Sequence, residues 1–230
     1  MSNSKTATIL KYAFIVLAIA EIIAEMISSE MLVHLTKPLL MPVLLVYMRK
    51  GTTRPINLSL LLAAAALIFS FVGDSVLMYA AKGEMYFLIG LGAFAIAQLF
   101  YVFSFSRAVN TNISPLSHLL KGLYALPFFI YSVVLLSMIW EGIGALQIPV
   151  TIYTLLIMFM ALSAVYRQGR ADREGVNQVI FGVILFVLSD SLIAIDRFYL
   201  PMENAGVFIM ITYILAQWNI VNGLVKHYNK

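Results

Sequence analysis

Charged and ionisable side chains interrupt the long apolar stretches of this chain at six positions. They are Glu21, Glu25, His34, Lys37, Asp74 and Asp190. A charged side chain facing lipid costs at least about 2.5–3.5 kcal/mol on insertion scales, so such groups normally face the interior of a helix bundle and pair there. Glu21 and Glu25 are four residues apart, which places both on one helix face. The pattern predicts a polar layer inside an apolar bundle.

Four carboxyl groups share this layer with a single permanent cation, Lys37. Four carboxylates cannot all remain ionised in a low-dielectric interior, so we expect at least one of them to hold a proton. A protonated carboxyl beside an ionised one is the arrangement that general acid–base catalysis uses. The alternative is a buried ion-pair network around Lys37 that only holds helices together.

Polar side chains without charge accompany these groups. Gln98 with Tyr101, and Tyr213 with Gln217, fall on common helix faces, where they would bind either a ligand or a neighbouring helix. The chain has no cysteine and only three histidines. Because a histidine metal site needs at least three converging ligands, we expect no metal and no cofactor.

The surrounding sequence is that of a membrane protein. Of its 230 residues, 62% are hydrophobic and 11% are charged, against roughly 25% charged in soluble domains. Apolar runs of close to ~20 residues predict one all-α transmembrane domain over residues 1–230, a polytopic bundle of about eight helices. The predicted spans are 8–28, 31–49, 57–81, 85–106, 117–139, 144–166, 176–198 and 206–225.

Basic residues gather on one side of this predicted topology. That side holds Lys5, Lys11, Arg49, Lys50, Arg54, Arg107, Lys121, Arg167, Arg170, Arg173, Lys226 and Lys230. The positive-inside rule therefore predicts a multi-pass protein with both termini in the cytoplasm. The sequence does not distinguish a bacterial inner membrane from the endoplasmic reticulum. The net charge of +4 is explained by basic loops beside anionic lipid, so we expect no nucleic-acid partner.

The two halves of the chain contain a weak internal sequence repeat. Gly73-Asp74-Ser75 corresponds to Ser189-Asp190-Ser191, and Ala97-Gln98 to Ala216-Gln217, at offsets of 116 and 119 residues. Four spans preserve the direction of the chain, as a four-plus-four parallel repeat requires. Two short matches leave both duplication and chance open.

Several short motifs in this order resemble one membrane-protein family. They are Thr36-Lys37-Pro38-Leu39, Gly73-Asp74, Ser189-Asp190-Ser191-Leu192-Ile193-Ala194 and Arg197-Phe198. With eight spans, they are similar to the YhhN-like integral membrane proteins, whose characterised members are lysoplasmalogenases. Asp196 departs from the pattern, since we expect asparagine or another polar residue there.

The resemblance implies a hydrolase that cleaves the vinyl ether bond of a lysoplasmalogen to a fatty aldehyde and a glycerophospho-alcohol. A vinyl ether hydrolyses by protonation of its β-carbon, which needs a positioned acid and a nearby anion but no metal. We expect Asp74 and Asp190 to be this catalytic pair. The expected substrate-binding residues are Lys37 and Arg197 for the phosphate, with Glu21, Glu25, Ser191, Gln98, Tyr101 and Gln217. The expected partners are a lysophospholipid and the bilayer.

Two other functions fit parts of the pattern. Buried acids and repeated topology also mark non-enzymatic lipid transporters and proton-coupled carriers. Asp74 and Asp190 on separate helices also look like the dyad of an intramembrane aspartyl protease. Phe71-Val72-Gly73 precedes Asp74 where such proteases have glycine-x-glycine, which argues against that reading.

Overall fold

The computed structural model describes the backbone of residues 2–229 and the side chains of residues 5–229. This part of the chain is built from α-helices. They are α1 (Ser2–Met26), α2 (Glu30–Gly51), α3 (Leu58–Leu77), α4 (Glu84–Arg107), α5 (His118–Ile143), α6 (Gln147–Val165), α7 (Arg173–Phe198) and α8 (Ala205–Asn229). Short 3₁₀ turns, η1 (Ala80–Lys82) and η2 (Gly144–Leu146), follow α3 and α5.

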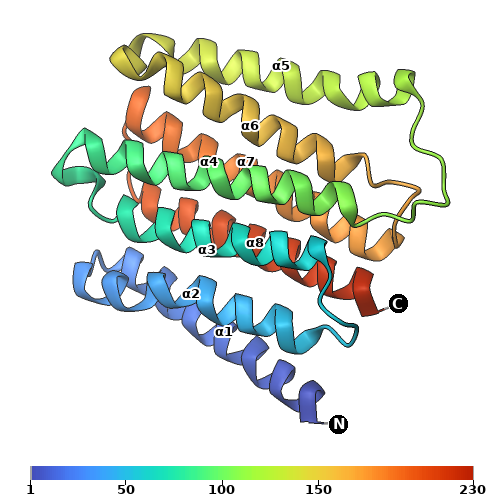
Figure 1. Cartoon of the computed structure of the whole chain (residues 1–230). Helices are drawn as coiled ribbons and strands as arrows, with labels where there is room; N and C mark the ends of the chain where they lie inside the picture. Colours follow the sequence, from blue (N-terminus) through green and yellow to red (C-terminus); the bar gives the residue numbers. More distant parts are fainter. Residues whose placement is uncertain (1, 230) are drawn as a thin grey trace.

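Seven helical segments within residues 5–229 are long and apolar enough to cross a membrane. The longest, residues 118–165, has 48 residues and would extend to roughly 70 Å at ~1.5 Å per residue, over twice the ~30 Å hydrocarbon core. This segment consists of two helices, α5 and α6, because the chain turns back at Gly144, where φ is 57°. Figure 1 shows the two helices side by side. The bundle thus agrees with the predicted count of about eight.

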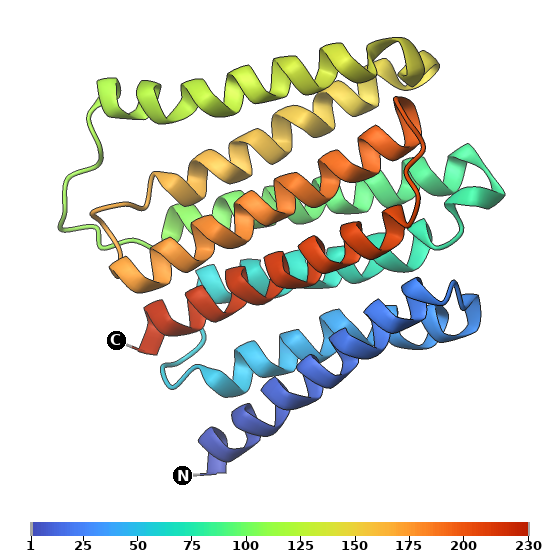
Figure 2. The same cartoon turned by 180° about the vertical axis from the view of Figure 1, so that it is seen from behind.

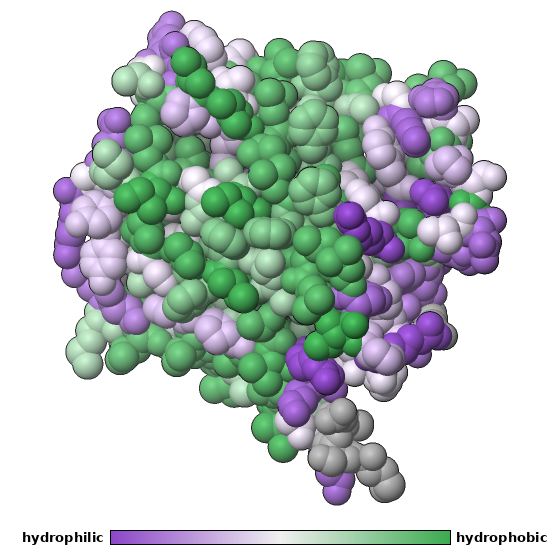
Figure 3. Space-filling model, in the orientation of Figure 1, coloured by the Kyte–Doolittle hydropathy of each residue, from purple (hydrophilic) through white to green (hydrophobic). Residues whose placement is uncertain are grey.

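The outer surface of the bundle is apolar between its two ends. In Figure 3 hydrophobic side chains cover the middle of the visible face, and hydrophilic ones gather where the helices end. Large apolar side chains such as Ile19, Phe129 and Phe181 are about half exposed. A surface of this kind is stable only against lipid. The chain is an integral, multi-pass membrane protein.

The helices form pairs arranged in layers. The α3–α4 and α7–α8 hairpins make the centre, with α1 and α2 on one side and α5 and α6 on the other (Figures 1 and 2). Glycines bring α7 and α8 together: Gly175 lies against Gly223, and Gly182 lies against Ala216. Small residues at a membrane helix crossing let the two backbones approach closely. The central layer therefore fixes the helices that carry the acidic residues.

Contacts inside the two central hairpins follow the predicted repeat. In the first hairpin Gly90 packs against the carbonyl of Gly73. At the corresponding positions of the second, the Ser189 hydroxyl donates to the carbonyl oxygen of Ile209 at 3.1 Å. Equivalent positions thus meet in both halves, which is what a duplicated four-helix unit would produce. The duplication itself stays a prediction.

Several predicted span ends differ from the helix ends by a few residues, and two of these differences bear on the arrangement of the helices. Helix α3 ends at Leu77 rather than 81, because the chain turns through Tyr79 into η1. Asp74 therefore lies in the last turn of its helix, nearer the helix end than the predicted span of 57–81 implies, yet it is only 4% exposed. Helix α5 continues through the predicted break at Glu141-Gly142. Gly142 is needed there because any side chain would collide with the backbone of Phe198.

Candidate functional site

A cavity between α2, α3, α7 and α8, near the ends opposite the two termini, holds both predicted catalytic residues. We call it the central cavity; its volume is about 210 Å³. It is lined by Lys37, Asp74, Leu77, Ala80, Phe87, Phe94, Ser189, Asp190, Ile193, Asp196, Arg197, Gly206, Ile209, Met210 and Tyr213. The structure therefore brings Asp74, Asp190, Lys37 and Arg197 to one place, although they come from three different helices.

Asp74 ends a chain of hydrogen bonds that crosses the bundle. The Tyr213 hydroxyl donates to Asp74 Oδ2 at 2.8 Å. Gln217 Nε2 lies 3.4 Å from the Tyr213 hydroxyl and 3.1 Å from Ser70 Oγ, and the Tyr101 hydroxyl donates to Gln217 Oε1 at 2.6 Å. Tyr101 and Gln217 are buried behind Tyr213. They are therefore positioned to orient Tyr213. Neither residue lines the central cavity, although the sequence predicts that both bind substrate.

Asp190 is oriented in a similar way from helices α4 and α6. The Tyr153 hydroxyl donates to Asp190 Oδ2 at 2.5 Å, and Gln98 Nε2 donates to the same oxygen at 3.4 Å. The hydrogen bonds described for Asp74 and Asp190 all end at Oδ2, which leaves Oδ1 of each carboxyl available for proton transfer. Gln98, which is predicted to bind substrate, thus contacts Asp190, one of the two predicted catalytic residues.

Lys37 is held by the two glutamates of the first helix. Its Nζ lies 3.2 Å from Glu25 Oε1 and 3.9 Å from Glu21 Oε1. Thr36 donates its hydroxyl hydrogen to the other oxygen of Glu21, a carboxyl that is fully buried. Lys37 thus pairs with both glutamates, as in the alternative reading of an ion-pair network, and Glu25 also lines a second cavity. A role of Glu21 and Glu25 in substrate binding stays a prediction.

Lys37 also lines a second, outer cavity at the ends of the helices. The other lining residues of this outer cavity are Glu25, Ser28, Glu30, Val33, His34, Met78, Tyr79, Ala81 and Lys82. Its acidic and basic groups lie close together, which suits a ligand that carries both charges. The ammonium group of Lys37 is the element that the outer and central cavities share.

Arg197 lies at the mouth of the central cavity and is largely exposed. Its guanidinium stacks over the ring of Phe87, 4.0 Å from the ring centre. This cation–π contact fixes the charge near the cavity. The neighbouring Asp196 accepts a hydrogen bond from the backbone N–H of Met202 at 2.8 Å, so the residue that departs from the family pattern also holds the α7–α8 turn.

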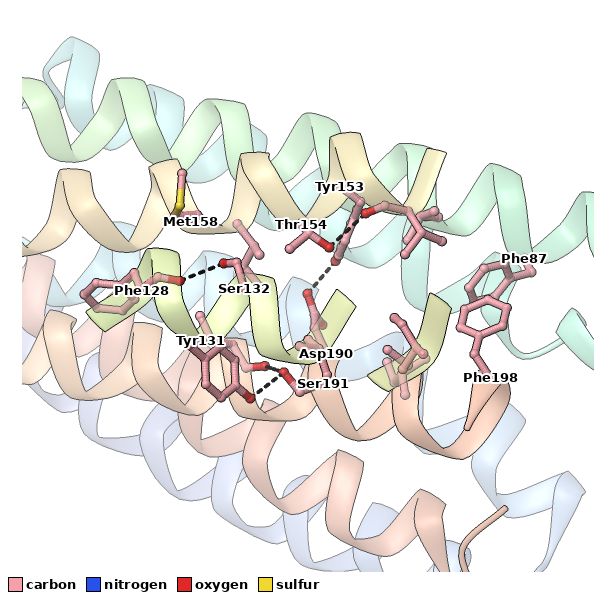
Figure 4. Close-up of a pocket in the computed structure, with 18 residues that line it drawn as sticks. Phe87, Phe128, Tyr131, Ser132, Tyr153, Thr154, Met158, Asp190, Ser191 and Phe198 are labelled. Carbon is pink, nitrogen blue, oxygen red and sulfur yellow. Dashed lines mark hydrogen bonds between the residues drawn. The ribbon is translucent and has the colours of Figure 1, made fainter. Parts of the chain in front are cut away.

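Ser191 points to the opposite side of α7, into a third cavity between α4, α5, α6 and α7 (Figure 4). We call it the side cavity. The Tyr131 hydroxyl donates to Ser191 Oγ at 2.8 Å, and Ser191 donates to the carbonyl of Val187 at 2.7 Å. Figure 4 shows Asp190 and Tyr153 joined within the same cavity.

Sequence reasoning missed Tyr153, Tyr131 and Phe87. Tyr153 is the direct partner of Asp190 but lies 37 residues away in the chain, in an apolar helix with no polar neighbour on its face. No local spacing relates the two residues. An isolated tyrosine hydroxyl deep in a predicted span was the available signal, since such a group needs a partner.

The arrangement suits acid–base chemistry at a ligand in the central cavity. Two carboxyls, each oriented by a tyrosine hydroxyl, face a cavity with low-dielectric walls and a lysine at its edge. Among the described residues, no three histidine, aspartate or glutamate side chains lie close enough together to hold a metal ion. The groups present are therefore those of an acid–base site with an anion-binding edge.

Comparison with known proteins gives a consistent set of relatives. Residues 32–224 match the model of the YhhN family. The chain is 32% identical to lysoplasmalogenase TMEM86A of Bos taurus over 165 residues, which cover 70% of this chain and 63% of that protein. It is 34% identical to lysoplasmalogenase TMEM86B of Homo sapiens over 157 residues, 68% of this chain and 60% of the relative.

The matched region thus spans about three fifths of the length of these curated relatives. No solved structure matches the chain at a comparable level. The family match extends from the second helix to the eighth, and so includes Lys37, Asp74, Asp190 and Arg197. From this match over most of its length, the chain belongs to the YhhN family.

Proposed function

We propose that this protein is a lysoplasmalogenase, which hydrolyses the vinyl ether bond of a lysoplasmalogen to a fatty aldehyde and a glycerophospho-alcohol. One observation carries the proposal: Asp74 and Asp190 line one cavity with Lys37. The relatives named lysoplasmalogenase support the substrate class. The cavity supplies the groups that this reaction needs.

The reaction begins when a protonated carboxyl of the Asp74–Asp190 pair gives its proton to the β-carbon of the vinyl ether. The α-carbon becomes an oxocarbenium ion, which the other, ionised carboxyl stabilises while it orients a water molecule. Water adds to the cation and loses a proton to that carboxylate, giving a hemiacetal. The hemiacetal collapses to aldehyde and alcohol, and one proton has passed from water to carbon.

The charged edge of the central cavity provides the phosphate site. Lys37 and Arg197 are the cations that line it. Lys37 holds the phosphodiester of the substrate as a point charge, and Arg197 binds it through the planar guanidinium group. Glu21 and Glu25 fix the position of the Lys37 ammonium group. The polar end of the head group then occupies the outer cavity, where acidic and basic groups both lie.

The orientation in the membrane follows from the basic loops. With both termini in the cytoplasm, the central and outer cavities face the non-cytoplasmic leaflet. Substrate would then come from that leaflet, and the water-soluble product would leave on that side. Accessibility of a cysteine introduced beside Lys82 to a membrane-impermeant reagent, in intact cells, tests this orientation.

The activity is tested with purified, folded protein and three lysophospholipids of the same head group. One carries a vinyl ether chain, one an alkyl ether chain and one an ester-linked chain. We expect aldehyde to appear only from the vinyl ether lipid. Absence of aldehyde from folded protein would contradict the proposal and favour a non-enzymatic lipid or proton-coupled carrier.

A further inference from the structure

The side cavity lies next to the proposed reaction centre, in the apolar part of the bundle. It shares Phe87, Asp190 and Ile193 with the central cavity, so these three residues form the wall between the two. The lining of the side cavity is apolar except for Asp190 and the hydroxyl groups of five residues (Figure 4). These are Tyr131, Ser132, Tyr153, Thr154 and Ser191. The wall therefore separates a charged space from an apolar one, with Asp190 facing both.

The other end of the side cavity reaches the lipid-facing surface. A surface groove between α5 and α7 is lined by Pro127, Phe128, Tyr131, Ile184, Val187 and Leu188. Three of these residues, Phe128, Tyr131 and Val187, also line the side cavity. These three side chains thus lie between the side cavity and the lipid-facing groove, so the side cavity ends next to the bilayer and away from the charged cavities.

The shape of the side cavity selects what can occupy it. Its volume is about 60 Å³, against about 210 Å³ for the central cavity, although it extends along α5 from Phe128 to Ile139, roughly 16 Å at ~1.5 Å per residue. A narrow, apolar space of this volume has no room for a ring or a second chain, and it must widen to take one unbranched chain.

Helix α5 is the element that can widen this space. Of its 26 residues, which the structure describes throughout, only Ser132, Ile139 and Ile143 are buried. Little buried contact holds α5 against its neighbours, so a small outward movement costs less here than in the central hairpins. An entering chain can therefore enlarge the cavity at this helix.

We propose that the side cavity binds the alkenyl chain of the substrate, with the vinyl ether carbons at Asp190, and that the fatty aldehyde leaves to the bilayer between α5 and α7. This inference rests on the proposed function. The phosphate lies across the Phe87–Ile193 wall in the central cavity. The two products therefore separate: the apolar aldehyde passes into lipid, and the charged alcohol leaves through the outer cavity.

Filling the cavity tests chain binding. Ser132→Leu adds bulk inside the side cavity, whereas Val133→Leu adds a single methylene group to the neighbouring, lipid-facing residue. We expect Ser132→Leu to lower kcat/KM for a long-chain lysoplasmalogen by on the order of tenfold, and to spare a short-chain analogue. Val133→Leu should leave both values unchanged. An equal loss on both chain lengths would overturn the inference.

A photoreactive lipid gives a second measurement that needs neither folding of a variant nor turnover. The probe is an alkyl ether lysophospholipid with a diazirine at the end of its chain, added to wild-type protein. We expect label on α5 and α7 near Phe128 and Val187, reduced by excess unlabelled lysoplasmalogen. Competable label confined to α1 and α2 would overturn the inference. Competable label at α5 without aldehyde production would contradict the enzymatic proposal alone.

Discussion

The hydroxyl of Tyr213 donates a hydrogen bond to Asp74, 139 residues earlier in the chain, across the interface between α8 and α3. Asp190 has the corresponding partner in Tyr153, which reaches it from α6. Each carboxyl is thus fixed by a phenol from another helix, at Oδ2 in both cases. The two tyrosines make a direct link between helix packing and the proposed chemistry.

Removing either phenol hydroxyl should slow the reaction without unfolding the protein. A hydrogen bond to a charged group contributes about 1.5–3 kcal/mol, so we expect Tyr213→Phe and Tyr153→Phe to lower kcat roughly ten- to a hundredfold. Tyr86→Phe, at a partly exposed tyrosine of α4, is the matched control and should retain activity. Aldehyde release under saturating substrate is the measurement. Wild-type rates in both variants would mean that these hydrogen bonds have no catalytic role.

The carboxyl pair should be indispensable. Asparagine keeps the size of the side chain and its hydrogen bond to tyrosine but cannot transfer a proton in the same way. We therefore expect Asp74→Asn and Asp190→Asn to lose turnover by at least about 10²–10⁴-fold while the melting temperature stays near that of wild type. Retained turnover in one variant would remove that residue from the pair.

Lys37 should contribute to both stability and substrate binding. Removing one partner of a buried ion pair costs roughly 3–5 kcal/mol, because the other charge is left uncompensated, so Lys37→Met should lower the melting temperature. Adding Glu21→Gln removes the fully buried charge and should restore part of the melting temperature, since Glu25 still lacks its partner, but KM should stay high because the cation is still missing. If the double variant also regains the wild-type KM, Lys37 does not bind the phosphate.

Glycine at the α7–α8 crossing should be essential for packing. A Cβ at position 182 would lie 2.7 Å from the carbonyl oxygen of Ala216, whereas one at Gly92 would meet nothing within 4 Å. Gly182→Ala should therefore destabilise the protein by about 1–3 kcal/mol, and Gly92→Ala should stabilise it by up to about 1 kcal/mol. Thermal unfolding in detergent compares the two. Equal shifts would show that the crossing is looser than described.

Much of this site could be predicted from the sequence because lipid makes the signal strong. A charge inside an apolar span is costly, so Asp74, Asp190 and Lys37 are conspicuous without any knowledge of the fold. The same contrast between apolar runs and polar breaks gives the helices to within a few residues at most ends. The shared helix face of Glu21 and Glu25 followed from their spacing, whereas their contacts with Lys37 depend on how α1 packs against α2.

The partners of these groups could not be predicted in the same way. Tyr153 and Asp190 meet only because α6 packs against α7, and helix packing leaves no local spacing in the sequence. The burial of Tyr101 and Gln217 behind Tyr213 depends on the α4–α8 arrangement, so their shared helix faces suggested a ligand where the structure has a supporting network. The side cavity depends on how α5 and α6 pack against α7, which no local spacing in the sequence encodes.

The central claim is that Asp74 and Asp190 deliver a solvent-derived proton to the β-carbon of a vinyl ether. It is tested by running the reaction in deuterium oxide, reducing the aldehyde to the alcohol as it forms, and measuring the mass of the product. A parallel sample of authentic aldehyde measures exchange with solvent. We predict one deuterium on the carbon next to the carbonyl, above the exchange control, with product formation lost in Asp74→Asn and Asp190→Asn. Aldehyde that carries no deuterium beyond the control, or full product formation by both variants, would contradict the account.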